Sequence, residues 1–139
     1  MDGTFKNYVN MEKIIQTIES LPKKRFTGAV SDELIVNAEK QLGASFSPEY
    51  KVFLKSFGSL LAKGEEILGV TGKNNNVVEA TITARSESDN FPKGMYVISK
   101  CGVDGILLVQ NPQGNVFSYQ ANSFLQKLGN SLSEYLESL

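Results

Sequence analysis

The sequence contains no histidine, only one cysteine and no long apolar run, and each absence excludes a class of protein. Without an imidazole, neither a Ser-His-Asp nor a Cys-His nucleophile system can be assembled. One cysteine without histidine also leaves a zinc ion short of its usual ligands. The single thiol, Cys101, can form no internal disulfide, which fits a reducing compartment.

Long apolar stretches are missing as well. The longest purely aliphatic run is residues 106–109, whereas a membrane-spanning helix needs about 20 apolar residues. The first residues include Asp2, Lys6 and Asn7 rather than an apolar core, so no signal peptide is expected. These observations predict a cytoplasmic protein that does not cross a membrane.

Positive charge is not in excess. Lys and Arg number 14 against 15 for Asp and Glu, and the net charge is −1. A sequence-independent nucleic-acid binder normally carries a clear basic excess that neutralises phosphates, so no direct nucleic-acid partner is expected. The one basic run, Lys23-Lys24-Arg25, follows Pro22 and is interpreted as a solvated loop.

Motifs for cofactors and calcium are also absent. The glycines at 64, 69 and 72 have neither the phosphate-loop nor the Rossmann spacing and are better explained by turns. No calcium-binding Asp-rich loop occurs. Glu65 and Glu66 are adjacent on a predicted strand, so they point to opposite faces and make a poor catalytic pair. We therefore expect no cofactor, no metal and no enzymatic activity.

What the sequence does contain is the pattern of one α+β domain. Apolar residues recur at helical spacing in four segments that begin or end at capping residues. Runs rich in β-branched residues, separated by turn residues, predict an antiparallel meander. The predicted helices are 11–18, 31–42, 47–57 and 131–139, and the predicted strands are 65–70, 95–99, 105–110 and 115–119.

Two segments allow alternatives, and a third has no pattern. Residues 77–85 are rich in β-branched residues, which favours a strand, but Asn76 and Glu79 have capping-box spacing, and we favour a helix. Residues 122–130 are compatible with a fourth strand or a short helix. Residues 1–8 are expected to be loosely structured. The order of the elements predicts a single domain over residues 1–139, with N-terminal helices and a C-terminal helix packed on a mainly antiparallel sheet.

The chain resembles the SUKH superfamily, the Smi/Knr-like domain, over about residues 10–139. The resemblance is carried by segments that share the order and spacing of the family. They are Ser31–Ile35 through Ala38-Glu39 to Leu42-Gly43, Ser47–Leu54 with Phe57-Gly58, Glu66–Gly69, Val78 through Thr81 to Arg85, Pro92 with Tyr96–Ile98, and Ser131–Leu136.

The resemblance implies a curved sheet flanked by helices and a function in protein binding. Bacterial members act mostly as immunity proteins that bind a cognate toxin domain, often a nuclease or deaminase. The fungal relative regulates cell-wall synthesis through protein contacts. The family implies no catalytic residues that could be carried over to this chain.

The leading hypothesis is an immunity protein, or antitoxin, that binds and neutralises a cognate bacterial polymorphic or contact-dependent toxin as a monomer or weak dimer. A toxin with a nuclease domain would offer a basic groove, which acidic loops could fill. The candidate partner-binding residues are accordingly Glu65, Glu66, Glu87, Asp89 and Asp104. The alternatives are a regulatory adaptor, a small-ligand binder and, last, an enzyme.

Overall fold

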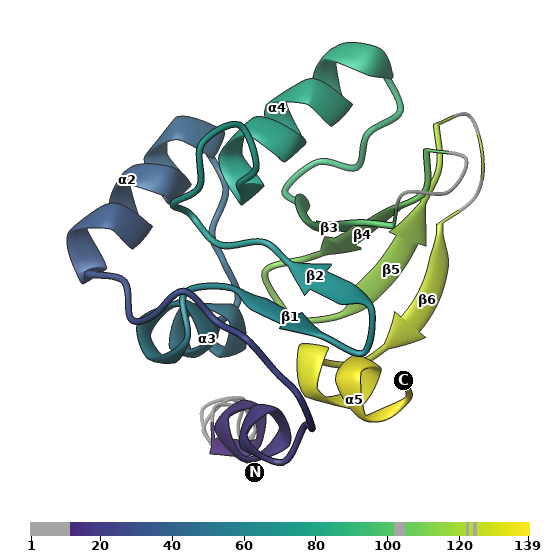
Figure 1. Ribbon diagram of the computed structural model, residues 1–139. Coiled ribbons are helices and arrows are strands. Elements are labelled where there is room, and N and C mark those ends of the chain that lie inside the picture. Colours follow the sequence, from purple (N-terminus) through teal and green to yellow (C-terminus); the bar gives the residue numbers. More distant parts are fainter. Residues whose placement is uncertain (1–11, 102–104, 122, 124) are drawn as a thin grey trace, which may run out of the picture.

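Figure 1 shows the computed structural model, which describes residues 12–101, 105–121, 123 and 125–139. The expectation for residues 1–8 lies outside this part of the chain. A helical segment at residues 12–19 comes first. The elements that follow are α2 (Asp32–Leu42), α3 (Pro48–Ser56), β1 (Leu60–Ala62), β2 (Glu65–Ile67), α4 (Val77–Glu87), β3 (Tyr96–Lys100), β4 (Leu107–Gln110), β5 (Val116–Tyr119), β6 (Gln126–Gly129) and α5 (Leu132–Glu137).

The helices begin where their capping side chains predict. Ser31, Ser47 and Ser131 each accept a hydrogen bond from a backbone N–H in the first turn of α2, α3 and α5. Asn76 does the same for α4, whose first-turn residue Glu79 donates its backbone N–H. Residues 77–85 are therefore helical, because a satisfied N-terminus outweighs the β-branched composition. Gly43 ends α2 in the left-handed conformation.

The main sheet is an antiparallel meander in the order β3-β4-β5-β6. The segment 122–130, for which a strand and a helix were both compatible with the sequence, contributes β6 and is a strand over Gln126–Gly129. β6 pairs with β5, and both this ladder and the one between β3 and β4 contain a register shift. The three strands predicted for this sheet therefore exist, with boundaries that differ from the sequence pattern by one or two residues.

The hairpin of β1 and β2 is only half predicted by the sequence. β2 ends at Ile67 rather than Val70, and its partner β1 has no counterpart among the predicted strands. The turn that joins them places Lys63 and Gly64 at positive φ. Arg25, expected in a solvated loop, pairs with Leu61 on β1 through two backbone hydrogen bonds of 2.9 and 2.8 Å. A backbone bond from Leu68 to Ile98 connects the hairpin to β3.

Both faces of the main sheet are covered. α4 lies on one face (Figure 1). Its Ala80 and Ala84 pack there in a cluster with Val97, Val109 and Tyr119. The other face belongs to the main core, which contains buried side chains of the 12–19 helix, α2, α3, the hairpin and α5. The aromatic side chains of α3 lie inside this core, with Tyr50 and Phe53 at 0% exposure. No helix in the described part of the chain is long and apolar enough to cross a bilayer.

Candidate interaction surfaces

The most polar part of the core is centred on Glu49 of α3. Its carboxylate is buried and accepts bonds from Leu132 N (2.7 Å), Ser133 N (3.0 Å) and Ser133 Oγ (2.8 Å) at the start of α5. Gln110 Nε2 donates to the same carboxylate at 3.3 Å. Burial raises the pKa of the Glu49 carboxyl, and the hydrogen bonds offset only part of that rise. Each of these groups is a donor, so the role of Glu49 is to dock α5.

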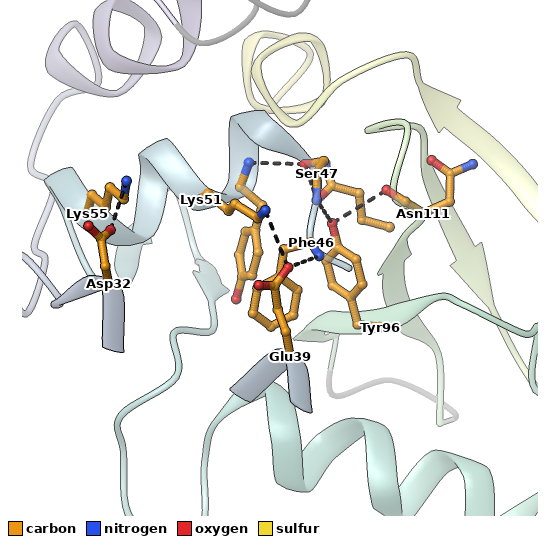
Figure 2. Close-up of polar contacts among 10 residues, drawn as sticks. Asp32, Glu39, Phe46, Ser47, Lys51, Lys55, Tyr96 and Asn111 are labelled. Carbon is orange, nitrogen blue, oxygen red and sulfur yellow. Dashed lines mark hydrogen bonds and ion pairs between the residues drawn. The ribbon is translucent and has the colours of Figure 1, made fainter. Parts of the chain in front are cut away.

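A second set of buried bonds connects the start of α3 to the sheet. Ser47 donates its backbone N–H to Tyr96 Oη at 2.8 Å, and Tyr96 donates its hydroxyl to Gln110 Oε1 at 2.7 Å. Figure 2 shows Ser47 and Tyr96 turned toward each other, with the Asn111 carbonyl beyond. Burial raises the pKa of the Tyr96 phenol, so this hydroxyl stays protonated at neutral pH. The buried network thus fixes the position of α3 relative to the sheet.

The surface around α2 and α3 carries paired charges. Figure 2 shows the Glu39 carboxylate of α2 between the Phe46 backbone N–H and the Lys51 ammonium. It accepts the Phe46 backbone N–H at 2.8 Å and lies 3.5 Å from the Lys51 ammonium. Asp32 and Lys55 form a second ion pair at 2.8 Å. Each pair places opposite charges side by side on this surface.

The five acidic residues expected to bind a partner are distributed over several places. Glu65 is half-buried and accepts the Tyr135 hydroxyl at 2.8 Å. Glu66, on the opposite face of β2, is exposed and accepts Asn75 Nδ2 at 2.9 Å. Glu87 ends α4, Asp89 lies in the loop that follows it, and Asp104 lies outside the described residues.

Three of these acids line three different recesses. Glu66 lines one of about 190 Å³ between the hairpin and residues 71–75, together with Thr27 and Ser59. Glu87 lines one of about 240 Å³ between α4 and the sheet. Asp89 lines a third, of about 380 Å³, near the end of α2. The acidic positions therefore form no common site in the part of the chain that the structure describes, and their role in partner binding stays a prediction.

The recess under α4 has an apolar floor and a charged rim. Ala80, Ala84 and Leu107 form the floor, and Glu79, Glu87 and Lys100 are on the rim. Its volume is below the several hundred Å³ that sites for drug-sized ligands usually have. A single side chain of a partner is a better match for its size than a metabolite.

The sequence singled out Glu66 but not the exposed row across the hairpin to which it belongs. Arg25 lies opposite Leu61, and Leu61 lies opposite Glu66, so these three side chains project on the same side. Leu61 is 47% exposed, and Phe26, the next residue after Arg25, is 50% exposed. The basic run is a signal for this segment, but only the pairing with β1 shows which side chains stand together.

The described residues contain no group of three acidic, cysteine or histidine side chains that could hold a metal ion. Burial, followed by the nearby Glu65 carboxylate, raises the pKa of the Cys101 thiol. A raised pKa lowers the thiolate fraction, so Cys101 is a weak nucleophile.

Comparison with known protein families matches residues 11–139 to SUKH_5, which is described as SMI1-KNR4 cell-wall. A search of curated proteins finds no match. The matched region covers all ten elements named above as well as the helical segment at residues 12–19. The α+β fold with antiparallel sheets agrees with the fold of this family. The chain therefore belongs to the SUKH_5 family of SMI1-KNR4 domains.

Proposed function

We propose that this protein is an immunity protein that binds a cognate toxin and blocks the toxin's active surface. Family membership over residues 11–139 carries the proposal, because it supports an immunity or Smi/Knr-like role in general. The proposed mechanism is steric and electrostatic, and the protein transforms nothing itself. Its place of action is the cytoplasm of the producing cell.

Blocking a toxin requires only a stable interface. Such interfaces bury on the order of 1,600 Å² in total, and a few anchor residues carry most of the binding energy. The fold suits this use, since α5, α3 and the sheet are joined by buried hydrogen bonds that keep the surface in one shape. A surface that is ordered before binding loses less conformational entropy in the complex.

Co-expression with the protein encoded by the adjacent gene tests the proposal. An immunity protein is expected to restore growth to cells that produce the neighbouring protein and to co-purify with it. A variant with a disrupted core, Tyr96→Asp, serves as the control and should fail to protect. Continued killing in the presence of abundant, folded protein would contradict the proposal.

A regulatory adaptor is the second candidate, and the words "SMI1-KNR4 cell-wall" in the family description favour it. An adaptor would act through contacts with cellular proteins and would need no toxin partner. The gene neighbourhood distinguishes the two candidates, since an adjacent toxin-like reading frame supports immunity. An unchanged toxin sensitivity together with a cell-wall phenotype on deletion would favour the adaptor.

A further inference from the structure

The face of the β1–β2 hairpin combines exposed apolar surface with unpaired positive charge. We define the hairpin face as the outward row of Arg25, Leu61 and Glu66, together with the adjacent Phe26 and the neighbouring cations Lys23 and Lys73. Phe26 and Leu61 are about half exposed. The Phe26 ring packs edge-on against Phe57 at 5.4 Å, which holds it in place while its outer side stays free.

The backbone determines which side chains share this face. Antiparallel residues that lie directly opposite each other project on the same side of the strands. Leu60 and Ala62, the neighbours of Leu61 on β1, are buried, so Leu61 must point away from the core. Arg25 is directly opposite Leu61, so its side chain points outward beside the leucine.

The free charge of the hairpin face is positive. Lys23, Arg25 and Lys73 make no ion pair in the described part of the chain. Glu66 projects on the same side and keeps its negative charge, since its bond partner Asn75 is neutral, so the three cations leave this face with a net positive charge. The side chain of Lys63 in the hairpin turn is also engaged, since its ammonium donates to the Leu139 carbonyl at 3.0 Å.

Close packing of glycines makes this face rigid. A Cβ on Gly58 would lie 2.1 Å from the Gly28 carbonyl oxygen, and a Cβ on Gly69 would lie 2.1 Å from the Gly58 oxygen. Three backbone segments therefore touch directly beneath the recess that Thr27 and Ser59 line. The side-chain bond from Ser59 to Thr27 at 3.1 Å joins two of these segments at the surface. Such a preformed surface loses little entropy on binding.

We propose that the hairpin face is the toxin-docking surface and that it takes a protein partner with carboxylates around an apolar recess. The inference rests on the immunity function proposed above. Phe26 and Leu61 enter the recess, and the unpaired cations meet the partner's carboxylates. Phe26 and Arg25 suit this role, because aromatic residues and Arg are enriched in the centres of interfaces. The partner's contact region is thus acidic, in contrast to a basic nuclease groove met by Glu87 or Asp89.

Two substitutions test the inference without disturbing the fold. Leu61→Asp alters a half-exposed side chain, and Arg25→Glu leaves the backbone pairing with β1 intact because only main-chain atoms form it. Ile82→Asp on α4 is the matched apolar control, since Ile82 is 49% exposed, and the exposed Lys93→Glu is the matched charge control. Circular dichroism establishes that each variant is folded.

Each variant is titrated with the purified protein encoded by the adjacent gene, in an inactive form, at low and high salt. Leu61→Asp is expected to weaken binding about 30-fold or more, as a central interface residue does. Arg25→Glu is expected to slow association about tenfold at low salt, with a smaller effect at high salt because salt screens the charges. Both controls should bind like the wild type.

Several outcomes would overturn the inference. If Leu61→Asp and Arg25→Glu bind like the wild type while Glu87→Lys does not bind, the interface belongs to the acidic residues. A wild-type dimer that Leu61→Asp separates in sedimentation would assign the hairpin face to a second copy of the chain. A neighbouring protein that does not bind the wild type at all would overturn the proposed function, and the inference that rests on it as well.

Discussion

Glu49 joins three parts of the chain through one carboxylate. It is carried by α3, and it accepts hydrogen bonds from Gln110 of β4 and from Leu132 and Ser133 of α5. Replacing it with Gln keeps one acceptor but turns an NH2 group toward N–H donors. A buried group that loses its partners costs roughly 1–3 kcal/mol, and more when the group is charged.

We therefore expect Glu49→Gln to lower the free energy of unfolding by about 2–4 kcal/mol, measured by urea denaturation. Glu79→Gln is the control, because Glu79 is exposed and its side chain makes no bond in the described part of the chain. The control should change stability by no more than about 0.5 kcal/mol. Equal losses in the two variants would contradict the docking role of Glu49.

The pH dependence of this residue follows from its raised pKa. The folded state holds the Glu49 proton more tightly than the unfolded state, because burial disfavours the charge. The resulting stability is fully present below the usual value of 4.5 and is lost as the pH rises through the raised pKa. The wild type should therefore exceed Glu49→Gln in stability by more below pH 4.5 than at neutral pH. Denaturation curves of both proteins at the two pH values measure this difference. A stability advantage of the wild type that grows with pH would contradict the raised pKa of Glu49.

At the scale of elements, α4 depends on the cap at its first turn. Asn76 Oδ1 accepts the Glu79 backbone N–H at 2.9 Å, and its Nδ2 donates to the Gly72 carbonyl at 2.8 Å. Asn76→Ala removes both bonds and should lower the unfolding free energy by about 1–2 kcal/mol. Asn90→Ala, whose side chain makes no bond in the described part of the chain, should have almost no effect. Chemical denaturation of both variants decides whether the cap contributes as expected.

The hairpin depends on the glycine contacts beneath it. Gly69 has an ordinary backbone conformation, but a Cβ there would lie 2.1 Å from the Gly58 oxygen. Gly69→Ala should cost about 1–3 kcal/mol through the clash alone and should shift the amide resonances of Gly58 and Gly28. Gly43→Ala is the contrasting case, since φ is 60° and no atom lies within 4 Å, so it should cost about 1 kcal/mol through backbone strain. Unchanged Gly58 and Gly28 resonances in Gly69→Ala would contradict this packing.

At the scale of the whole molecule, two buried tyrosines link core packing to alkaline pH. Tyr50 donates to the Leu68 carbonyl, and Tyr96 lies beside it with ring centroids 5.4 Å apart. Burial raises the pKa of both phenols above the usual value of 10.0. The stability that these raised pKa values contribute is fully present below pH 10.0. It is lost as the pH rises through the raised pKa values.

These two tyrosines should therefore ionise only as the protein unfolds. The tyrosinate absorbance that they contribute and the loss of circular dichroism are expected to coincide in an alkaline titration. The same titration in urea, where all phenols are exposed, provides the reference near pH 10. Complete tyrosinate formation in a protein that keeps its native dichroism would contradict the burial of both rings.

Local sequence determined the helix starts, the meander and the class of the fold. Ser31, Ser47 and Ser131 cap helices through bonds to residues only three positions away, so neighbours in the chain were sufficient to predict them. The spacing of turns likewise predicted β3, β4 and β5. The absence of histidine excludes imidazole chemistry whatever shape the chain adopts, because no fold can supply a missing side chain.

Only the tertiary structure decided which side chains share a face. Arg25 and Leu61 are far apart in the chain and become neighbours through a backbone pairing that no local pattern encodes. The acidic residues were grouped by charge, but Glu65 turns to Tyr135 while Glu66 turns to Asn75, because successive strand residues point to opposite sides. Glu49 could not be identified as the docking group of α5, since its partners lie 83 and 84 residues away. Local periodicity determines which elements form, whereas long-range pairing and burial determine what their surfaces present.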